Sequence, residues 1–315
     1  MPRIVSMINW KGGVGKSTLS LHLGVGLMKF SEQKPRPKIL LVDLDPQCNL
    51  SYLSLGVSKY IEYVYDQGKP TLKNIFDAYF KGEHFDTSRA IIPKPIKASP
   101  GKIWVDVDLL PSHHELVLVD MRLAREKKSG TTHQEETRYE IEKLSIIKNA
   151  IDQVASKYDY VILDCPPNIN LVTQNSFFAS DSYVIPAIPD FLSTVGISLI
   201  RSEMDRLNTS FAQMIGYAGI PSNYSNADLK GIIFNMVDEW GGGPKQTHRD
   251  TINSMQAQHP GLVFENYITD GDGISTAADN NMTVYSYQDF PKSKANAEKQ
   301  ADSLQRVTKE FIARV

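Results

Sequence analysis

The sequence predicts an α/β fold, in which a mostly parallel twisted sheet is covered by helices on both faces. Short apolar runs alternate along the chain with longer stretches of helical periodicity, the pattern of repeated strand–helix units. One of these runs, Ile39–Asp43, lacks the alternation of a half-exposed strand, as is typical of a strand buried on both faces. We expect residues 1–315 to form one such domain, with an elaborated region at about 57–145.

Each strand of the sheet is expected at an apolar run. The runs are Arg3–Ile8, Ile39–Asp43, Ile103–Leu110, Tyr160–Asp164, Tyr183–Ile188, Gly231–Val237 and Val263–Ile268. Turn-forming residues separate them from the helical stretches, as in the proline-containing loop at 34–37 before the second run. Together the runs predict a sheet of six or more strands.

The helices are indicated by apolar residues that recur every three or four positions. After the first strand these residues are Leu19, Leu23, Leu27 and Phe30. Before the strand at Tyr160 they are Leu144, Ile147, Ile151 and Val154. The last helix carries a stripe that we expect to pack on the sheet rather than to insert into a membrane, formed by Leu304, Val307 and Phe311.

The region between about residues 56 and 143 has the least regular pattern, because several prolines interrupt it. A helix is expected to open at Ser112, since Glu115 three residues later completes a capping box. The neighbouring His113 and His114 would then point to different sides of that helix. That geometry argues against a metal site built on the two histidines.

The composition is that of an ordinary globular protein. The 34 basic and 36 acidic residues give a net charge of −2, and 22% of the residues are charged and 41% hydrophobic. This balance excludes a disordered tail and a broadly basic chromatin protein. Any contact with nucleic acid must therefore come from a local patch, or from one assembled by dimerisation.

Three features of the sequence point to the cytoplasm. No apolar run approaches the ~18 residues that identify a membrane-spanning helix. The amino-terminal segment has neither the apolar stretch nor the cleavage site of a signal peptide. Cys48 and Cys165 make up neither a disulfide framework nor a zinc site, as suits a reducing compartment.

A glycine-rich segment between the first strand and the first helix carries the clearest chemical signal. It reads Lys11-Gly12-Gly13-Val14-Gly15-Lys16-Ser17-Thr18. Glycines allow successive backbone N–H groups to turn toward an anion, and the following helix adds the positive end of its dipole. Lys16 would contribute a full charge to the β- and γ-phosphates of ATP, and Ser17 a hydroxyl to Mg²⁺. The segment therefore predicts a nucleotide-binding loop of the P-loop NTPase type.

The loop departs from the usual pattern in one respect. Trp10 stands where the first glycine is usual, and a second lysine, Lys11, follows it. In this the segment resembles the deviant signature of the ParA/Soj and MinD group of ATPases. In that group the early lysine reaches across an ATP-bound dimer to the partner's phosphates. The resemblance implies that Lys11 acts in trans, stabilises charge on the phosphoryl oxygens and is catalytic together with Lys16.

The resemblance covers nearly the whole chain and extends to three aspartates. Two of them, Asp43 and Asp45, precede Pro-Gln in a pattern close to that of the ParA type. The pattern implies that Asp45 orients the attacking water. Because ligands bind at the carboxyl ends of parallel strands, Asp43 is expected to hold Mg²⁺ through water. Asp164, before Cys-Pro-Pro, resembles the aspartate of the Walker B and switch segment and would also hold Mg²⁺ through water.

Further contacts are implied in the last third of the chain. Asn235, just after a strand, resembles the residue that contacts adenine in related proteins. Partition ATPases bind DNA non-specifically through basic residues of this region. The candidates here are Arg201, Arg206, Lys245 and Arg249. Asp270 and Asp272 stand where the family often has Pro-Arg-Asn, and their acidity argues against DNA binding.

The resemblance implies a cytoplasmic ATPase that uses ATP and Mg²⁺, forms a homodimer when ATP-bound, hydrolyses slowly alone and is stimulated by a ParB-like partner. Its expected task is the segregation of plasmid or chromosomal DNA, with nucleoid association and without membrane binding. Two alternatives are the positioning of a protein cargo and a nucleotide-dependent regulatory switch, both without DNA binding. A metabolic or assembly enzyme on the same scaffold would need ligand cysteines or a second substrate pocket, and the sequence indicates neither.

Overall fold

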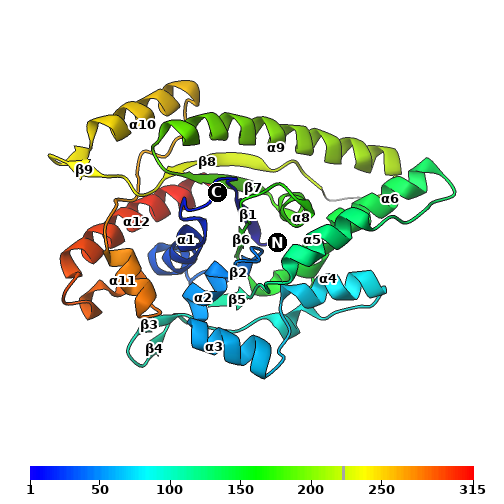
Figure 1. The fold of residues 1–315 in the computed structure, drawn as a ribbon, viewed down its shortest axis with the longest axis horizontal. Helices are drawn as coiled ribbons and strands as arrows, with labels where there is room; N and C mark the ends of the chain where they lie inside the picture. Colours follow the sequence, from blue (N-terminus) through cyan, green and yellow to red (C-terminus); the bar gives the residue numbers. More distant parts are fainter. Residues whose placement is uncertain (222–223) are drawn as a thin grey trace.

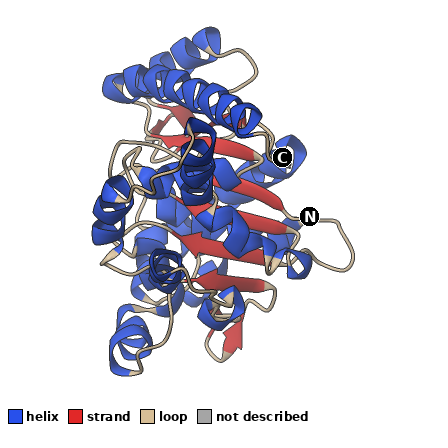
Figure 2. Ribbon diagram, turned by 90° about the vertical axis from the view of Figure 1, so that its right-hand side faces the viewer, coloured by secondary structure: helices blue, strands red, loops and turns tan. Residues whose placement is uncertain are grey.

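The computed structural model describes residues 1–221 and 224–315. Its centre is a six-stranded sheet in the order β5–β2–β6–β1–β7–β8, and neighbouring strands pair in parallel. The strands are β1 (Arg3–Met7), β2 (Ile39–Asp43), β5 (Val107–Leu110), β6 (Tyr160–Asp164), β7 (Ser182–Ala187) and β8 (Asp228–Phe234). Figure 2 shows helices on both sides of the sheet, so the predicted fold class is confirmed.

The helical segments form two layers around the sheet (Figure 1). One layer contains α1 (Lys16–Phe30), α2 (Asn49–Leu55), α11 (Gly273–Asp279), η4 (Val284–Asp289) and α12 (Lys294–Arg314). The other contains α4 (Leu72–Lys81), α5 (Leu116–Arg125), α6 (His133–Leu144), α7 (Ile146–Asp152), α8 (Leu171–Ala179) and α9 (Phe191–Ala218). Shorter or peripheral segments are α3 (Val57–Ile61), η1 (Glu62–Asp66), η2 (Thr87–Ala90), η3 (Ala155–Lys157) and α10 (Gln246–Gln258).

The central strands are apolar at successive positions because each serves two cores. Along β2, Ile39 and Leu41 pack in the core that contains α1 and α12, whereas Leu40 and Val42 pack in the core that contains α4, α5 and α7. Successive residues of a strand point to opposite faces, so a strand covered on both sides needs apolar side chains on both. All five residues of β2 and all five of β6 are buried.

Two strand predictions differ from the structure. The run Val263–Ile268 is not a strand: Val263 forms only an isolated bridge with Ile232 of β8. Two residues later, the N–H groups of Glu265 and Asn266 donate to the carboxylate of Glu310 on α12 instead of to β8. The chain meets the sheet edge again where the Ile268 N–H donates to the Phe234 carbonyl at 2.9 Å. The run at 103–110 joins the central sheet only as β5, while its start, β4 (Lys102–Ile103), pairs with β3 (Lys97–Ser99) in a separate hairpin.

The helix predicted before β6 is divided in two. Its apolar residues are buried as expected: Leu144, Ile147, Ile151 and Val154. At Ser145 the backbone leaves the helical conformation (φ −92°, ψ 4°), and α6 ends there while α7 begins. The apolar periodicity therefore identified the buried face but not the break.

The last helix, α12, packs on α1, as its apolar stripe predicts. Leu304, Val307 and Phe311 are buried in the α1 core. The two helices approach closely at Gly26, where an added Cβ would lie 2.6 Å from Thr308 Oγ1. Within residues 1–221 and 224–315, no helix combines the length and the apolar character needed to cross a membrane.

His22 of α1 connects the start of that helix to η4. Its ring is fully buried, with Nδ1 2.7 Å from the Thr18 carbonyl and Nε2 3.0 Å from the Val284 N–H. The Val284 N–H donates to Nε2, so Nδ1 carries the proton of a neutral imidazole. Burial lowers the pKa of His22 to about 4, while the hydrogen bond to Thr18 opposes this shift.

The free energy of unfolding is therefore expected to fall with acidification below about pH 6.5, the ordinary pKa of histidine. The unfolded chain takes up the proton first, so stability is lost as the pH drops from about 6.5 toward about 4, by about 3 kcal/mol in total. Urea unfolding of wild type and His22→Gln at pH 7 and pH 5 measures this loss. Equal losses in both proteins would contradict the assignment to His22.

Candidate functional site

The glycine-rich loop lies between β1 and α1 and adopts conformations that side chains disfavour. Gly13 has φ +76° and Gly15 has φ +81°, both in the left-handed region. A Cβ on Gly15 would also lie 2.1 Å from Asn235 Nδ2. By contrast, Gly12 and Gly13 have open space where a side chain would project. The loop backbone therefore borders a space from which a ligand can approach closely.

That space is a cavity of about 640 Å³. It is lined by six residues of the predicted loop, namely Gly12, Gly13, Gly15, Lys16, Ser17 and Thr18. Asp45, Gln47 and Tyr52 line it from the loop after β2 and from α2. Val14 is fully buried and leaves only its backbone near the site. The structure thus brings the predicted loop and Asp45 to one cavity.

Lys16 is the cation of this cavity. Its side chain is largely buried, and its Nζ lies 3.2 Å from the carbonyl oxygen of Lys11. Burial lowers the pKa of Lys16, whereas the charges of Asp164 and Asp45 raise it. A partly desolvated ammonium beside open loop N–H groups suits the binding of an anion such as a phosphate.

Asp164 at the end of β6 has one carboxylate oxygen without a partner. Oδ1 accepts a hydrogen bond from Ser20 Oγ at 3.1 Å, but no residue in the described part of the chain donates to the buried Oδ2. Burial raises the pKa of Asp164, and interactions with Ser17 and Lys16 oppose the shift. A hydroxyl and a free carboxylate oxygen are ligands that Mg²⁺ prefers, so Ser17 and Asp164 fit this ion.

Asp43 and Asp45 have different surroundings. Asp43 is fully buried, and its Oδ2 accepts hydrogen bonds from Ser51 N at 2.8 Å and Ser51 Oγ at 2.6 Å. Asp45 accepts a hydrogen bond from the N–H of Gln47 through Oδ1 at 2.8 Å and lines the cavity. The magnesium role of Asp43 stays a prediction, and the structure shows this side chain holding the start of α2.

Lys11 does not line the cavity that contains Lys16. Its Nζ lies 2.5 Å from Asp190 Oδ2 and 3.5 Å from Ser193 Oγ. Asp190 is also the amino-terminal cap of α9, because its Oδ1 accepts the N–H of Ser193. Partial burial favours a raised pKa for Asp190, but hydrogen bonds from Lys11 and Ser193 outweigh it and lower the pKa. Within this protomer the two lysines of the signature therefore have separate partners.

Asn235 braces the loop from the end of β8. Its Nδ2 donates to the Val14 carbonyl at 3.2 Å, and its Oδ1 accepts the N–H of Met236 at 3.0 Å. Together with Thr18 and Ile274 it also lines a cavity of about 250 Å³ beside α1. Contact with adenine stays a prediction, while the contact with the loop is an additional role.

The four basic residues proposed for DNA binding lie on or beside two neighbouring helices, α9 and α10 (Figure 1). Arg206 pairs with Glu203, and Lys245 pairs with Asp238. Arg201 lies 3.3 Å from His259 Nδ1, and Arg249 donates to the Pro244 carbonyl at 3.0 Å. Each side chain thus has an intramolecular contact, and DNA binding by them stays a prediction.

The predicted capping role of Ser112 is wrong. Helix α5 begins at Leu116, and its cap position is Glu115, without a side-chain hydrogen bond. Ser112 Oγ instead donates to the carbonyl oxygen of Asp45 at 2.7 Å. The two histidines also differ from expectation, because the rings of His113 and His114 stack with centroids 4.5 Å apart. Among the described residues, no group of three or more His, Cys, Asp and Glu side chains is placed to hold a metal ion.

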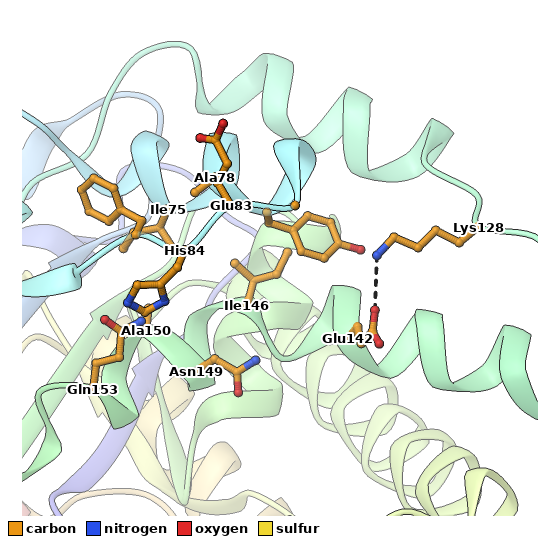
Figure 3. Close-up of a pocket in the computed structure, with 13 residues that line it drawn as sticks. Ile75, Ala78, Glu83, His84, Lys128, Glu142, Ile146, Asn149, Ala150 and Gln153 are labelled. Atoms are coloured by element: carbon orange, nitrogen blue, oxygen red, sulfur yellow. Dashed lines mark hydrogen bonds and ion pairs between the residues drawn. The ribbon is translucent and has the colours of Figure 1, made fainter.

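A separate cavity of about 280 Å³ lies between α4 and α7 (Figure 3). The ion pair of Lys128 with Glu142, at 3.2 Å, stands at one side of it. The hydroxyl of Tyr79 is buried there, and no described residue hydrogen-bonds to it. Burial raises the pKa of Tyr79 to about 12. This cavity shares no described lining residue with the cavity at the loop.

Comparison with known proteins shows the family of this chain. A family model described as AAA domain matches residues 2–216. The virulence plasmid ParA family protein pGP5-D of Chlamydia psittaci is 30% identical over 254 residues, which cover 80% of this chain and 76% of that protein. The chain belongs to the AAA-domain family as a ParA-type P-loop ATPase.

Two further similarities extend over most of this ParA-type chain. The sporulation initiation inhibitor protein Soj of Bacillus subtilis is 28% identical over 76% of this chain and 74% of its own length. Among solved structures, an McdA variant from Cyanothece in complex with ATP has a TM-score of 0.65 at 19% identity, and 96% of each chain is covered. At that identity the structure supports the fold alone.

Proposed function

We propose that this ParA-type ATPase is a dimerising switch that hydrolyses ATP with Mg²⁺ to drive the segregation of plasmid or chromosomal DNA, with residues 1–315 acting as one domain. The main support is the separation of the two signature lysines: Lys16 lines the cavity, whereas Lys11 is directed to Asp190 outside it. A lysine in that position is suited to serve the nucleotide of a second copy.

The residues of the cavity divide the chemistry among them. The N–H groups of the loop and the ammonium of Lys16 would hold the phosphates. Ser17 and Asp164 would hold Mg²⁺, which supplies positive charge to the phosphoryl oxygens when it is bound. Asp45, with its carboxylate at the cavity, would orient the attacking water. Positioning and charge neutralisation then account for most of the acceleration.

The contact between Lys11 and Asp190 is weak enough to be exchanged for an intermolecular one. The two side chains are 35% and 39% exposed. An ion pair so accessible to water contributes only about 0–1 kcal/mol. Little free energy is therefore lost when the Lys11 ammonium leaves Asp190 to contact the phosphates of a partner's ATP.

Dimerisation is tested by light scattering with Mg²⁺ and a non-hydrolysable ATP analogue or ADP. We expect twice the protomer mass of 35.3 kDa with the analogue and the protomer mass with ADP. A mobility-shift assay on non-specific DNA under both conditions tests the cargo, and retention only with the analogue is expected for DNA segregation. A protomer mass in both conditions would contradict the switch.

The alternative of a protein cargo has its own structural support. Arg206 and Lys245 are neutralised by Glu203 and Asp238, and the exposed Asp270 and Asp272 add negative charge just before α11. Negligible retention of DNA by an ATP-bound dimer would favour this alternative, or a regulatory switch. In either case we propose slow basal turnover, stimulation by a ParB-like partner and a cytoplasmic location, with nucleoid association only if DNA is bound.

A further inference from the structure

Buried hydrogen bonds connect Asp45 to the end of the neighbouring strand β5. Ser112 Oγ donates to the Asp45 carbonyl at 2.7 Å, and the Ser112 N–H donates to Ser51 Oγ at 3.0 Å. Ser51 Oγ in turn donates to Asp43 Oδ2 at 2.6 Å. Asp43, Ser51 and Ser112 are fully buried, and Asp45 is 5% exposed. Water therefore has little access to compete for these bonds.

The sheet places Ser112 at this point. Strands β5 and β2 run in parallel with Leu110 opposite Val42, so the residues that follow both strands meet at the same edge. Ser112 is two residues beyond β5, and Asp45 is two residues beyond β2. Ser51 lies in the first turn of α2 and bridges the two segments.

We propose that Ser112 is a positioning residue for Asp45, an inference that rests on the proposed water-orienting function of Asp45. Ser112 does not line the cavity, so it acts through the backbone that it holds. The Asp45 carbonyl has two donors, the hydroxyl of Ser112 and the N–H of Cys48 at 2.9 Å. Removing the Ser112 hydroxyl leaves only the Cys48 N–H as a donor to this carbonyl. The Asp45 backbone is then no longer held to the end of β5, and its carboxylate can move.

The expected consequence is a loss in turnover with little change in nucleotide binding. A misplaced catalytic group lowers the rate of the chemical step, whereas the loop and Lys16 continue to hold the phosphates. For Ser112→Ala we expect kcat for phosphate release to fall about tenfold and the dissociation constant for ATP to stay within about twofold of wild type.

Ser54 provides a matched control on α2. It is buried like Ser112, but its Oγ has no hydrogen-bond partner among the described residues. Ser54→Ala therefore removes the same buried hydroxyl group without breaking a hydrogen bond. Its kcat is expected to stay close to that of wild type. An equal loss in Ser54→Ala would show that Ser112→Ala acts by general disturbance of the packing, and would overturn the proposal.

The reactivity of the Cys48 thiol tests the role of Ser112 without nucleotide. Its thiol is buried beside Tyr60, whose hydroxyl donates to both Cys48 Sγ, at 3.3 Å, and the Ser112 carbonyl, at 3.0 Å. Ser112→Ala should loosen this loop and speed the labelling of Cys48 by a thiol reagent in the nucleotide-free protein. Cys165, also fully buried, reports on global opening and should keep its labelling rate.

The outcomes separate this inference from the proposed function. Wild-type kcat and wild-type Cys48 labelling in Ser112→Ala, together with an impaired Asp45→Ala, would overturn the positioning role alone. An unimpaired Asp45→Ala would overturn the function of Asp45 and the inference with it. Three results in Ser112→Ala would together support the positioning role of Ser112 and the function of Asp45. These are a reduced kcat, an unchanged ATP affinity, and faster labelling of Cys48 but not of Cys165.

Discussion

Replacing Lys11 with alanine is expected to lower the rate of ATP hydrolysis by about 10³–10⁵-fold, the range observed when a cation supplied to the transferred phosphate is lost. The expectation follows from the place of Lys11 at the start of the loop and from its pairing with Asp190 rather than lining its own cavity. Phosphate release by Lys11→Ala at saturating ATP and Mg²⁺ measures the effect. Binding of ATP to the single protomer should change little, because Lys16 provides the cation of the cavity.

The control for Lys11→Ala must separate the loss of a phosphate contact from the loss of the ion pair with Asp190. Asp190→Asn breaks the ion pair but keeps an oxygen that can still accept the N–H of Ser193 and cap α9. This variant should hydrolyse ATP at least as fast as wild type, since Lys11 is then free to reach a phosphate. A rate as low as that of Lys11→Ala would assign the effect to the ion pair.

The strands of the fold could be predicted where an unbroken apolar run indicates a strand buried on both faces. The apolar runs at β2 and β6 required no long-range information, because each strand contacts two layers of helices. The run Val263–Ile268 also lies beside β8, but the N–H groups of Glu265 and Asn266 donate to the distant Glu310 carboxylate instead of to that strand. Such competition between a sheet edge and a side chain 45 residues away is not visible in a local pattern.

The part of the site that depends on local sequence could also be predicted. Loop residues and strand-end aspartates are placed by neighbours in sequence, and the structure brings Lys16, Ser17 and Asp45 to one cavity. The prediction for Ser112 is wrong because its spacing to Glu115 matches a capping box, whereas its partner Asp45 is 67 residues away, in the loop after β2. The position of Ser112 just after a strand, like that of Asp45, was the signal that pointed to the site.

Replacing Asp45 with alanine is expected to lower ATP hydrolysis by about 10²–10⁴-fold, the contribution of a group that handles the attacking water. ATP should still bind and still promote dimerisation, so the variant accumulates as an ATP-bound dimer. Gln47→Ala removes another side chain that lines the same cavity and leaves the Asp45 carboxylate in place. It should hydrolyse at a rate close to wild type, and equal losses in both variants would contradict a specific role for Asp45.

Mixing the two inactive variants tests whether Lys11 acts on the partner's nucleotide. In a mixed dimer, the site of the Lys11→Ala chain keeps Asp45 and receives Lys11 from the Asp45→Ala chain, so it is complete. The other site lacks both residues. When the two variants are mixed in equal amounts, about half of the dimers are mixed, and one of the two sites in each mixed dimer is active. About one quarter of the wild-type rate should therefore return. If Lys11 acts within its own chain, every site lacks one residue and no activity returns, even though light scattering with a non-hydrolysable analogue shows dimers.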